Sequence, residues 1–374
     1  MKKAIPALAL AICSCLQVNS QAQITQILPL DYGVTGVRQS DDNGDLVITG
    51  GTGPASLDMP SPAFLYSGAI PESTSSDGTY TNDLTPIING TAVTGGVQFY
   101  GPNTPFYDPW IGNGNILAVG AYKTTTNSTY QDGVMYLGPL TGSSSSNSWT
   151  PINVPNSLAG GTNLVGDTIP HSTMGSLVVG NYDTQISDLG QGFIYNITNQ
   201  SYSQISFGGV TTAYGIWQDG GSNGNTYTIV GGYTTNLNQN GYIVNYNSSN
   251  AQFSDFTPLS FNNDPSLVTH FEGINAYSNG FSLAANTANG AAYCYVPTNS
   301  DGSFGTATWI GISNSINTNI TTGDTVISNS VIGIFPIESP NISSYVYTVP
   351  EPSTYALFGL CALALVIACR RRVS

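Results

Sequence analysis

The chain of 374 residues is poor in charged residues, and poorest in basic ones. Only 7 residues are Lys or Arg against 21 Asp or Glu, and charged residues make up 7% of the sequence. Lys2 and Lys3 lie near the start of the sequence, and Arg370, Arg371 and Arg372 lie near its end. Arg38 and Lys123 are the only basic residues between them. Clustered Lys and Arg are what hold phosphate backbones and anionic lipid surfaces. Nucleic acid is therefore excluded as a partner, and so is a basic patch for membranes.

The body of the chain is correspondingly acidic. Residues 23–348 contain 20 acidic and two basic residues, a formal charge of −18. The acidic residues are scattered, which predicts a soluble, weakly self-repelling surface. Sialidase-type chemistry needs an arginine cluster for its carboxylate substrate, and a single arginine cannot supply one. The chain is still 40% hydrophobic with 22 tyrosines, so its composition is not that of a disordered protein.

Cysteine and histidine are scarce as well. Four of the five cysteines lie in the terminal segments, which leaves Cys294 alone in the body and excludes an internal disulfide there. Cys294 shares a strand face with Ala292 and Val296, which predicts a buried free thiol. Phosphate-cradling loops, zinc signatures and nucleophile elbows are absent.

The body is repetitive. Short apolar strands ending in Gly-x-Tyr recur, and each is followed by a polar loop and a second strand that begins with glycine. The first strands are 116–122, 177–182 and 228–233, and the second strands begin at Gly133, Gly192, Gly241 and Gly290. Looser copies occur at 46–51 with 63–66 and at 331–334 with 345–347. The leading glycines lie 59, 49 and 49 residues apart, so the unit is 50 to 60 residues long.

Further strands complete the unit. The segments 214–216 and 272–275 precede some copies, and 202–207 follows another. Four short strands per unit, repeated about six times, predict an all-β fold with a β-propeller of about six blades. Residues 23–348 contain no stretch of sustained helical periodicity. A β-sandwich or a right-handed β-solenoid is the alternative, although the strands are widely spaced for short solenoid rungs.

The last 26 residues have a different character. They comprise Val349, Pro350, Glu351 and Pro352, then the uncharged apolar run 355–369, then Arg370, Arg371 and Arg372. The apolar run has 15 residues, and flanking residues can extend it toward the roughly 20 that a membrane span needs. Arginines after the span hold that end in the cytoplasm, which places the body on the outer side. The two prolines keep the segment around Glu351 extended, as suits a protease substrate.

This tripartite tail resembles the PEP-CTERM sorting tail of exported bacterial proteins. The resemblance covers residues 349–374 only. It implies processing by a membrane protease of the exosortase type, and a plain uncut anchor is the alternative. After cutting, the product is either released or attached to an envelope glycan.

The N-terminus fits an export route. Lys2 and Lys3 precede a short apolar core, and a small-x-small pattern ends at Ala22. This predicts a signal peptide at 1–22, recognised by the export machinery, and a mature chain that begins at Gln23. Lipoprotein processing at Cys15 is the alternative. The expected domains are therefore 1–22, a β-repeat body at 23–348 and the sorting tail at 349–374.

The body also resembles an extracellular repeat family named for its His-Ala-Phe run. The matching pieces are Gly273-Ile274-Asn275, Val178-Val179-Gly180 and Ala63-Phe64-Leu65-Tyr66. No single copy carries every piece, and the histidine is absent. The resemblance implies an extracellular location and no particular mechanism.

Two histidines, His171 and His270, are present in the whole chain. His270 and Glu272 are two residues apart and share a face if the segment is a strand. They are either an acid–base pair or half a metal site, or else a structural polar pair at a blade edge, apart from any cleft. The structural interpretation is favoured, and His171 is expected in a loop without a partner.

Asp41, Asn43 and Asp45 place oxygens at alternate positions, as the start of a calcium loop does. The glycine and the closing glutamate of an EF-hand are missing, so a hairpin turn is favoured over calcium. No other cofactor is predicted. The four tryptophans lie beside polar segments, where an exposed ring would stack on a sugar, although packing is the more frequent role.

These observations favour an exported, non-enzymatic protein of the cell surface or extracellular matrix. Extracellular polysaccharide is a possible partner. The alternative is a polysaccharide-binding or polysaccharide-degrading propeller, in which paired carboxylates such as Asp183 and Asp188 would act. A calcium-dependent glycan-binding module is a third hypothesis, and its thermal midpoint would fall on chelation.

The tail yields a first prediction. Intact-mass analysis of extracellular material should show a species that lacks both the leader and the apolar tail. Full-length tails found only in the inner membrane would contradict processing and identify a permanent anchor.

Overall fold

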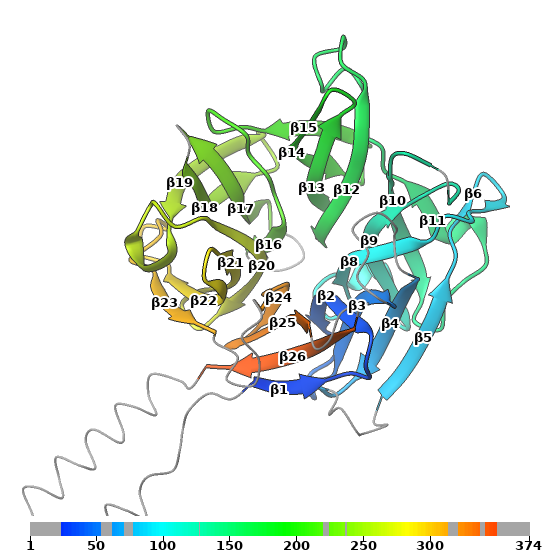
Figure 1. Ribbon diagram of the computed structural model, residues 1–374, viewed down its shortest axis with the longest axis horizontal. Helices are drawn as coiled ribbons and strands as arrows, with labels where there is room; N and C mark the ends of the chain where they lie inside the picture. The colour runs from blue at the N-terminus through cyan, green and yellow to red at the C-terminus, as the bar shows by residue number, and fades with distance from the viewer. Residues whose placement is uncertain are drawn as a thin grey trace, which may run out of the picture.

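Six four-stranded antiparallel sheets stand around a central axis as the blades of a β-propeller (Figure 1). The computed structural model describes residues 24–53, 62–70, 78–126, 128–219, 224–235, 238–312, 321–336 and 341–349. This arrangement confirms the predicted all-β class and the six blades. The leader at 1–22 and the tail from Pro350 onward lie outside the described residues. No helix among the described residues is long and apolar enough to cross a membrane, and the expected span at 355–369 is not among them.

Each blade runs from an innermost strand beside the axis to an outermost strand at the rim (Figure 1). From the axis outward, blade 1 consists of β2 (Tyr32–Gln39), β3 (Leu46–Thr52), β4 (Ala63–Gly68) and β5 (Gly78–Leu84). Blade 2 consists of β8 (Val97–Asn103), β9 (Asn115–Tyr122), β10 (Asp132–Pro139) and β11 (Trp149–Pro151). Blade 3 consists of β12 (Val165–Met174), β13 (Leu177–Thr184), β14 (Ser187–Asn196) and β15 (Ser201–Ile205). Blade 4 consists of β16 (Gly215–Asp219), β17 (Thr226–Thr235), β18 (Asn238–Asn247) and β19 (Gln252–Leu259). Blade 5 consists of β20 (Thr269–Tyr277), β21 (Gly280–Thr287), β22 (Gly290–Pro297) and β23 (Thr308–Gly311). Blade 6 consists of β24 (Thr325–Ile327), β25 (Ser330–Pro336), β26 (Ile342–Thr348) and β1 (Ile24–Ile27), which comes from the other end of the chain. The remaining elements are the hairpin β6 (Ile87–Ile88) and β7 (Thr91–Ala92) and the 3-10 helices η1 (Pro109–Ile111), η2 (Ser146–Ser148) and η3 (Phe261–Asn263).

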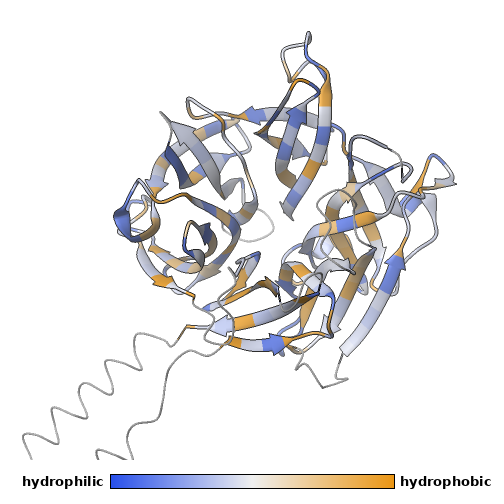
Figure 2. Ribbon diagram, in the orientation of Figure 1, coloured by the Kyte–Doolittle hydropathy of each residue, from blue (hydrophilic) through white to orange (hydrophobic). Residues whose placement is uncertain are grey.

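The sequence repeat corresponds to the blade. The strands that end in Gly-x-Tyr are the second strands β9, β13 and β17, and the glycine-led strands are the third strands β10, β14, β18 and β22. These middle strands are buried on both faces because neighbouring blades pack face to face, so their apolar runs are nearly continuous. Figure 2 shows hydrophobic stretches along them and a hydrophilic outer strand at β5. Cys294 lies fully buried on β22 as a free thiol, as predicted.

The ring is closed by strands from the two ends of the chain. β1 pairs antiparallel with β26, with Ile24 opposite Tyr347 and Ile27 opposite Ser344. The predicted first residue of the mature chain, Gln23, immediately precedes β1. At the other end Val349 is 6% exposed, and its N–H donates to the carbonyl of Asn329 at 2.9 Å. The sorting tail therefore begins where blade 6 ends.

The closure predicts a specific loss of stability. Ile27 is 1% exposed on β1, and Ile27→Ala should lower the free energy of unfolding by about 2–4 kcal/mol because it leaves a cavity in blade 6. Thr25 is exposed on the same strand, so Thr25→Ala is a matched control and should change stability by less than about 0.5 kcal/mol. Urea unfolding measures both. Equal effects of the two variants would mean that β1 does not close the ring.

Candidate binding site on the propeller axis

Every blade has a one-residue β-bulge at the same height, which lies on the innermost strand in blades 1, 2, 3 and 5 and directly before it in blades 4 and 6. In blades 1, 2, 3 and 5 the register between the innermost and the second strand shifts by one residue. The extra residue on the innermost strand is Thr35, Tyr100, His171 and Glu272, respectively. In blade 4 the pairing passes from Thr211 with Tyr233 to Gly215 with Val230, which adds one residue around Tyr214. Blade 6 shows the same shift around Asp324. A bulge changes the direction of a side chain. In each blade, therefore, the side chain of one residue points in a direction that the alternation along its strand would not give it.

The recurring glycine of the second strand follows from the bulge. A Cβ on Gly120 would lie 2.0 Å from the carbonyl oxygen of Gln98, and one on Gly231 would lie 2.0 Å from that of Thr212. Gly50, Gly180 and Gly333 face the same close approach of an innermost-strand carbonyl. Only glycine tolerates such an approach without displacing the strand. The repeat glycine recognised in the sequence is thus the partner of the bulge.

The six bulge residues form what we call the axial ring. Its members are Thr35, Tyr100, His171, Tyr214, Glu272 and Asp324. Each is partly exposed, whereas the residues immediately before and after it are buried. This alternation, the same in all six blades, indicates that solvent reaches the axis at the height of the ring.

Aromatic contacts join the ring across blades. The ring centroids of Tyr100 and His171 are 4.8 Å apart, and those of His171 and Tyr214 are 4.4 Å apart. Tyr214 in turn lies 5.6 Å from His270 of blade 5. Thr35 of blade 1 donates its hydroxyl to the carbonyl of Phe99 in blade 2. The contacts therefore pass continuously from blade 1 to blade 5.

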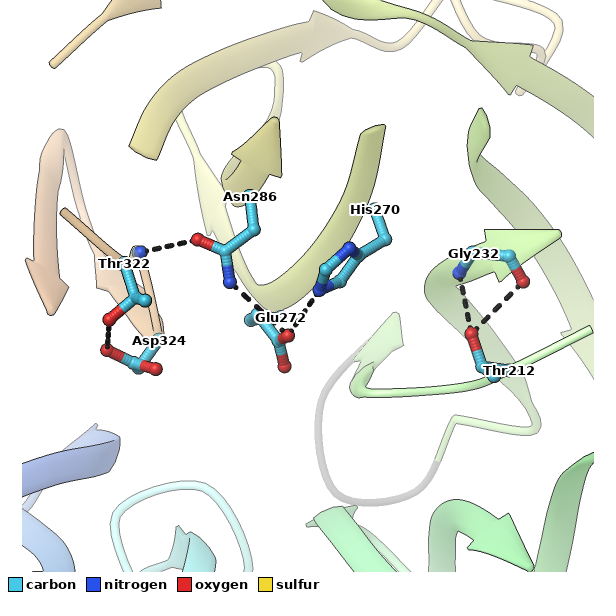
Figure 3. A network of polar contacts seen from close by, with 8 residues as sticks. Thr212, Gly232, His270, Glu272, Asn286, Thr322 and Asp324 are labelled. Atoms are coloured by element: carbon cyan, nitrogen blue, oxygen red, sulfur yellow. Dashed lines mark hydrogen bonds and ion pairs between the residues drawn. The ribbon is translucent and has the colours of Figure 1, made fainter. Parts of the chain in front are cut away.

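His270 and Glu272 extend the network toward blade 6. His270 Nε2 and Glu272 Oε1 are 2.6 Å apart, and Asn286 Nδ2 donates to the same oxygen at 3.4 Å. Asn286 Oδ1 accepts from the N–H of Gly323 at 2.8 Å, next to Asp324. Figure 3 shows Glu272 and Asp324 pointing into the space between the blades.

The charge of Glu272 acts on four other blades. Burial and then this charge raise the pKa of Tyr100 to about 12, and both also raise the pKa of Tyr214. Burial lowers the pKa of His171 to about 4 against the opposing effect of Glu272, so His171 is neutral at pH 7. Burial and Glu272 together raise the pKa of Asp324 to about 7.

The pKa values of His270 and Glu272 are both shifted toward the charged pair. Burial lowers the pKa of His270, but the charge and hydrogen bond of Glu272 outweigh burial and raise it overall. Burial raises the pKa of Glu272, but His270 outweighs that effect and the pKa is lowered overall. The pKa values of two carboxyl groups in one site are thus shifted in opposite directions. The pKa of Glu272 is lowered, so Glu272 is ionised, whereas the pKa of Asp324 is raised, so Asp324 is able to keep its proton.

The axis is closed below the ring. Three residues further along the innermost strands lie Arg38, Asn103, Met174, Trp217, Asn275 and Ile327, of which all but Trp217 are buried. Arg38 Nη2 in blade 1 donates to the carbonyl of Ile216 in blade 4 at 3.2 Å, so its side chain crosses the axis. Its guanidinium carbon lies 5.6 Å from the ring centroid of Trp217, which also packs on Tyr107 at 5.3 Å. These residues therefore close the axis on one side of the partly exposed axial ring.

The structure corrects two expectations about the histidines. His270 and Glu272 do not lie apart from the axis; they lie on β20, the innermost strand of blade 5, with Asp324 close enough to affect their pKa values. His171 is not a loop residue without a partner, because it lies on β12 between two tyrosine rings. The one-residue bulge re-aims these side chains, and strand periodicity alone does not reveal it.

Asp41, Asn43 and Asp45 lie in the hairpin between β2 and β3. Asp41 Oδ1 accepts the N–H groups of Asn43 and Asp45, each at 3.0 Å, and Asp41 Oδ2 accepts from Asn43 Nδ2 at 3.1 Å. The turn thus uses both oxygens of Asp41. Among the described residues no three His, Cys, Asp or Glu side chains group so as to hold a metal ion. Calcium binding stays an untested hypothesis.

Asp183 and Asp188 do not belong to the axial ring. Asp183 on β13 accepts the N–H of Asp167 at 2.6 Å, and Asp188 is exposed on β14. Sequence reasoning missed Tyr100, Tyr214 and Asp324 as site residues. A sequence pattern could have indicated some of them. Residues 34–36, 99–101, 213–215 and 271–273 each read apolar-x-Gly, and the middle residue of each is a member of the axial ring.

Residues 348–372 match the PEP-CTERM protein-sorting motif. The motif implies an exported protein that is processed by an exosortase, a membrane protease. It covers the tail alone. The resemblance of the body to the His-Ala-Phe repeat family is not confirmed.

No curated protein matches the chain. Solved structures with a similar arrangement include a post-proline cleaving enzyme from Rickettsia typhi, with 11% identity, a TM-score of 0.41 and coverage of 89% of this chain and 44% of that one. The Dos1 propeller has 8% identity, a TM-score of 0.40 and coverage of 87% and 94%. The NanB sialidase from Streptococcus pneumoniae has 11% identity, a TM-score of 0.38 and coverage of 88% and 57%. Likenesses this distant carry no argument about function, and this chain spans less than half of the Rickettsia enzyme.

The raised pKa of Asp324 predicts a pH-dependent effect of its removal. Because its pKa rises from 3.8 to about 7 on folding, the protonated form is favoured in the folded state. Its contribution to stability is complete below pH 3.8 and is lost as the pH rises through 7. Asp324→Asn should therefore exceed the wild type in free energy of unfolding by on the order of 2 kcal/mol at pH 8 and by little at pH 4.

Denaturant unfolding at the two pH values measures this difference. Asp42→Asn is the matched control, since Asp42 is exposed and lies outside the axial ring. A stability gain of Asp324→Asn that is the same at pH 4 and pH 8 would show that the ring does not hold this carboxyl group protonated.

Proposed function

We propose that the protein is an exported surface or extracellular-matrix protein that binds a glycan in the axial ring without transforming it. The observation that supports this most is the convergence on the axis of one partly exposed side chain from each blade. Tyrosine faces and hydrogen-bonding groups from several elements are the means by which proteins hold sugar rings. The sorting motif supports an extracellular setting, where polysaccharide is abundant.

The charge of the body narrows the ligand class. Both of its basic residues are buried, with Arg38 4% and Lys123 9% exposed, so neither forms part of a cationic surface. The axial ring itself contains Glu272 and Asp324. Glycans rich in carboxylate or sulfate would meet repulsion there without a compensating arginine. The ligand is therefore a neutral or amine-bearing sugar.

A second candidate function is a glycan hydrolase that acts at the same place. It is favoured by the opposite pKa shifts of Glu272 and Asp324, because a protonated and an ionised carboxyl group are the parts of an acid–base pair. In that case Asp324 would donate a proton to the leaving oxygen, and Glu272 would activate water or attack the sugar.

Binding to neutral tetrasaccharides of glucose, xylose, mannose and N-acetylglucosamine tests the first proposal by calorimetry. Tyr214→Ala should weaken the binding of at least one of them by about tenfold, since it removes an aromatic face from the ring. Tyr202→Ala on the outermost strand β15 is the matched control and should bind as the wild type does. Binding that is absent, or equal in both variants, would contradict the axial site.

The same oligosaccharides separate binding from catalysis. The proposal expects them to be recovered intact after prolonged incubation. If reducing ends are released, Glu272→Gln decides whether the ring is responsible, because it retains the shape of the side chain and loses the carboxylate. Release by the wild type and none by Glu272→Gln would establish the hydrolase instead.

A further inference from the structure

A cavity lies beyond the closed end of the axis. It has a volume of about 320 Å³, near the lower end of the range for small-molecule sites. Its walls are the turns after β12, β14 and β18, η1 from blade 2, Gln218 from β16, and Gly224, Asn225 and Tyr227 at and just before the start of β17. Gln218 lines it and directly follows Trp217, which closes the axis. The cavity therefore opens between blades 3 and 4 on the face opposite to the axial ring.

Its lining is neutral and rich in hydrogen-bonding groups. None of the described residues that line it has a carboxylate, ammonium or guanidinium group. Trp110 lines it and is 48% exposed, the highest exposed fraction of any aromatic residue among those the structure describes. The polar side chains around it are Ser176, Thr198, Gln218, Asn225, Tyr227 and Ser248. One exposed aromatic face among hydroxyl and amide groups matches the alternating apolar and polar faces of a neutral sugar.

Hydrogen bonds hold the floor of the cavity. Gln218 Nε2 donates to the carbonyl of Gly224 at 2.7 Å and to the Tyr227 hydroxyl at 3.2 Å. Gly175 has φ +60°, and a Cβ there would lie 2.5 Å from the Tyr227 oxygen, so only glycine leaves this floor open. Both polar side chains are at least 94% buried, which presets their orientation before a ligand arrives.

The exposed indole is tied to this floor. Asp108 directly precedes η1, which carries Trp110, and its Oδ2 accepts the N–H of Gly175 at 2.7 Å. Asp108 Oδ1 is buried and has no hydrogen-bond partner among the described residues. The other three tryptophans of the body pack in hydrophobic clusters, as expected for most tryptophans. Trp110 is the exception, although its turn is firmly anchored.

We propose that this cavity is a second glycan-binding site, which takes a neutral segment of about disaccharide size with one sugar stacked on Trp110. The site shares no residue with the axial ring and lies on the opposite face. Two sites on opposite faces allow one molecule to join two polysaccharide strands, and such bivalence strengthens attachment without any new contact.

Native gels that contain hydroxyethyl cellulose, dextran, galactomannan or amylopectin test the site with the exported protein. At least one of these neutral polymers should retard the wild type. Trp110→Ala should weaken the apparent affinity for that polymer by about tenfold, as truncation of a stacked tryptophan does. Phe106→Ala is the matched control, because Phe106 is 39% exposed on the same loop and does not line the cavity. It should migrate as the wild type does.

Tyr214→Ala separates this site from the axial ring. Retardation that persists in Tyr214→Ala and disappears in the double variant with Trp110→Ala supports the second site, even if the axial proposal fails. No retardation by any of the four polymers would overturn the inference. So would equal retardation of Trp110→Ala and the wild type.

Discussion

The β-bulge in each blade is the constraint on which the site depends. One extra residue moves the inner carbonyl toward the second strand, so that in five of the six blades a Cβ at the facing position would collide with it. Glycine at 50, 120, 180, 231 and 333 meets this constraint in five blades, and Ala285 occupies the position in blade 5. The same extra residue turns Thr35, Tyr100, His171, Tyr214, Glu272 and Asp324 toward the axis. The structural repeat therefore also positions the six residues of the axial ring.

Electrostatics then gives the six positions different roles. Glu272 is the common neighbour, and its charge reaches Tyr100, His171, Tyr214 and Asp324 although these belong to four other blades. His270 balances Glu272 directly, which lets a carboxylate persist in a desolvated place. Asp324 has no such partner and tends to keep its proton. Arg38, the one arginine of the body, is used inside the fold to close the axis, so it is absent from the surface.

The ends of the chain belong to the same blade. β1 follows directly after the predicted leader, and β26 leads directly into the sorting tail, so both processing signals flank the seam of the propeller. Blade 6 is complete only when the two ends of the body have met. This arrangement keeps the six-bladed body as one unit whatever happens to the residues on either side.

Much of this protein followed from local sequence patterns. Strand length, turn residues and the 50-residue spacing predicted an all-β propeller of six blades, since both faces of a middle strand are buried and its apolar run is therefore plain to read. The scarcity of Lys and Arg excluded polyanionic partners, and the tail predicted export. The placement of His270, Glu272 and His171 could not be read in this way. A single-residue bulge reverses which face a side chain takes, and partners such as His171 and Glu272 are about 100 residues apart. Only the closed ring brings six distant segments to one axis and leaves Trp110 exposed beside a cavity.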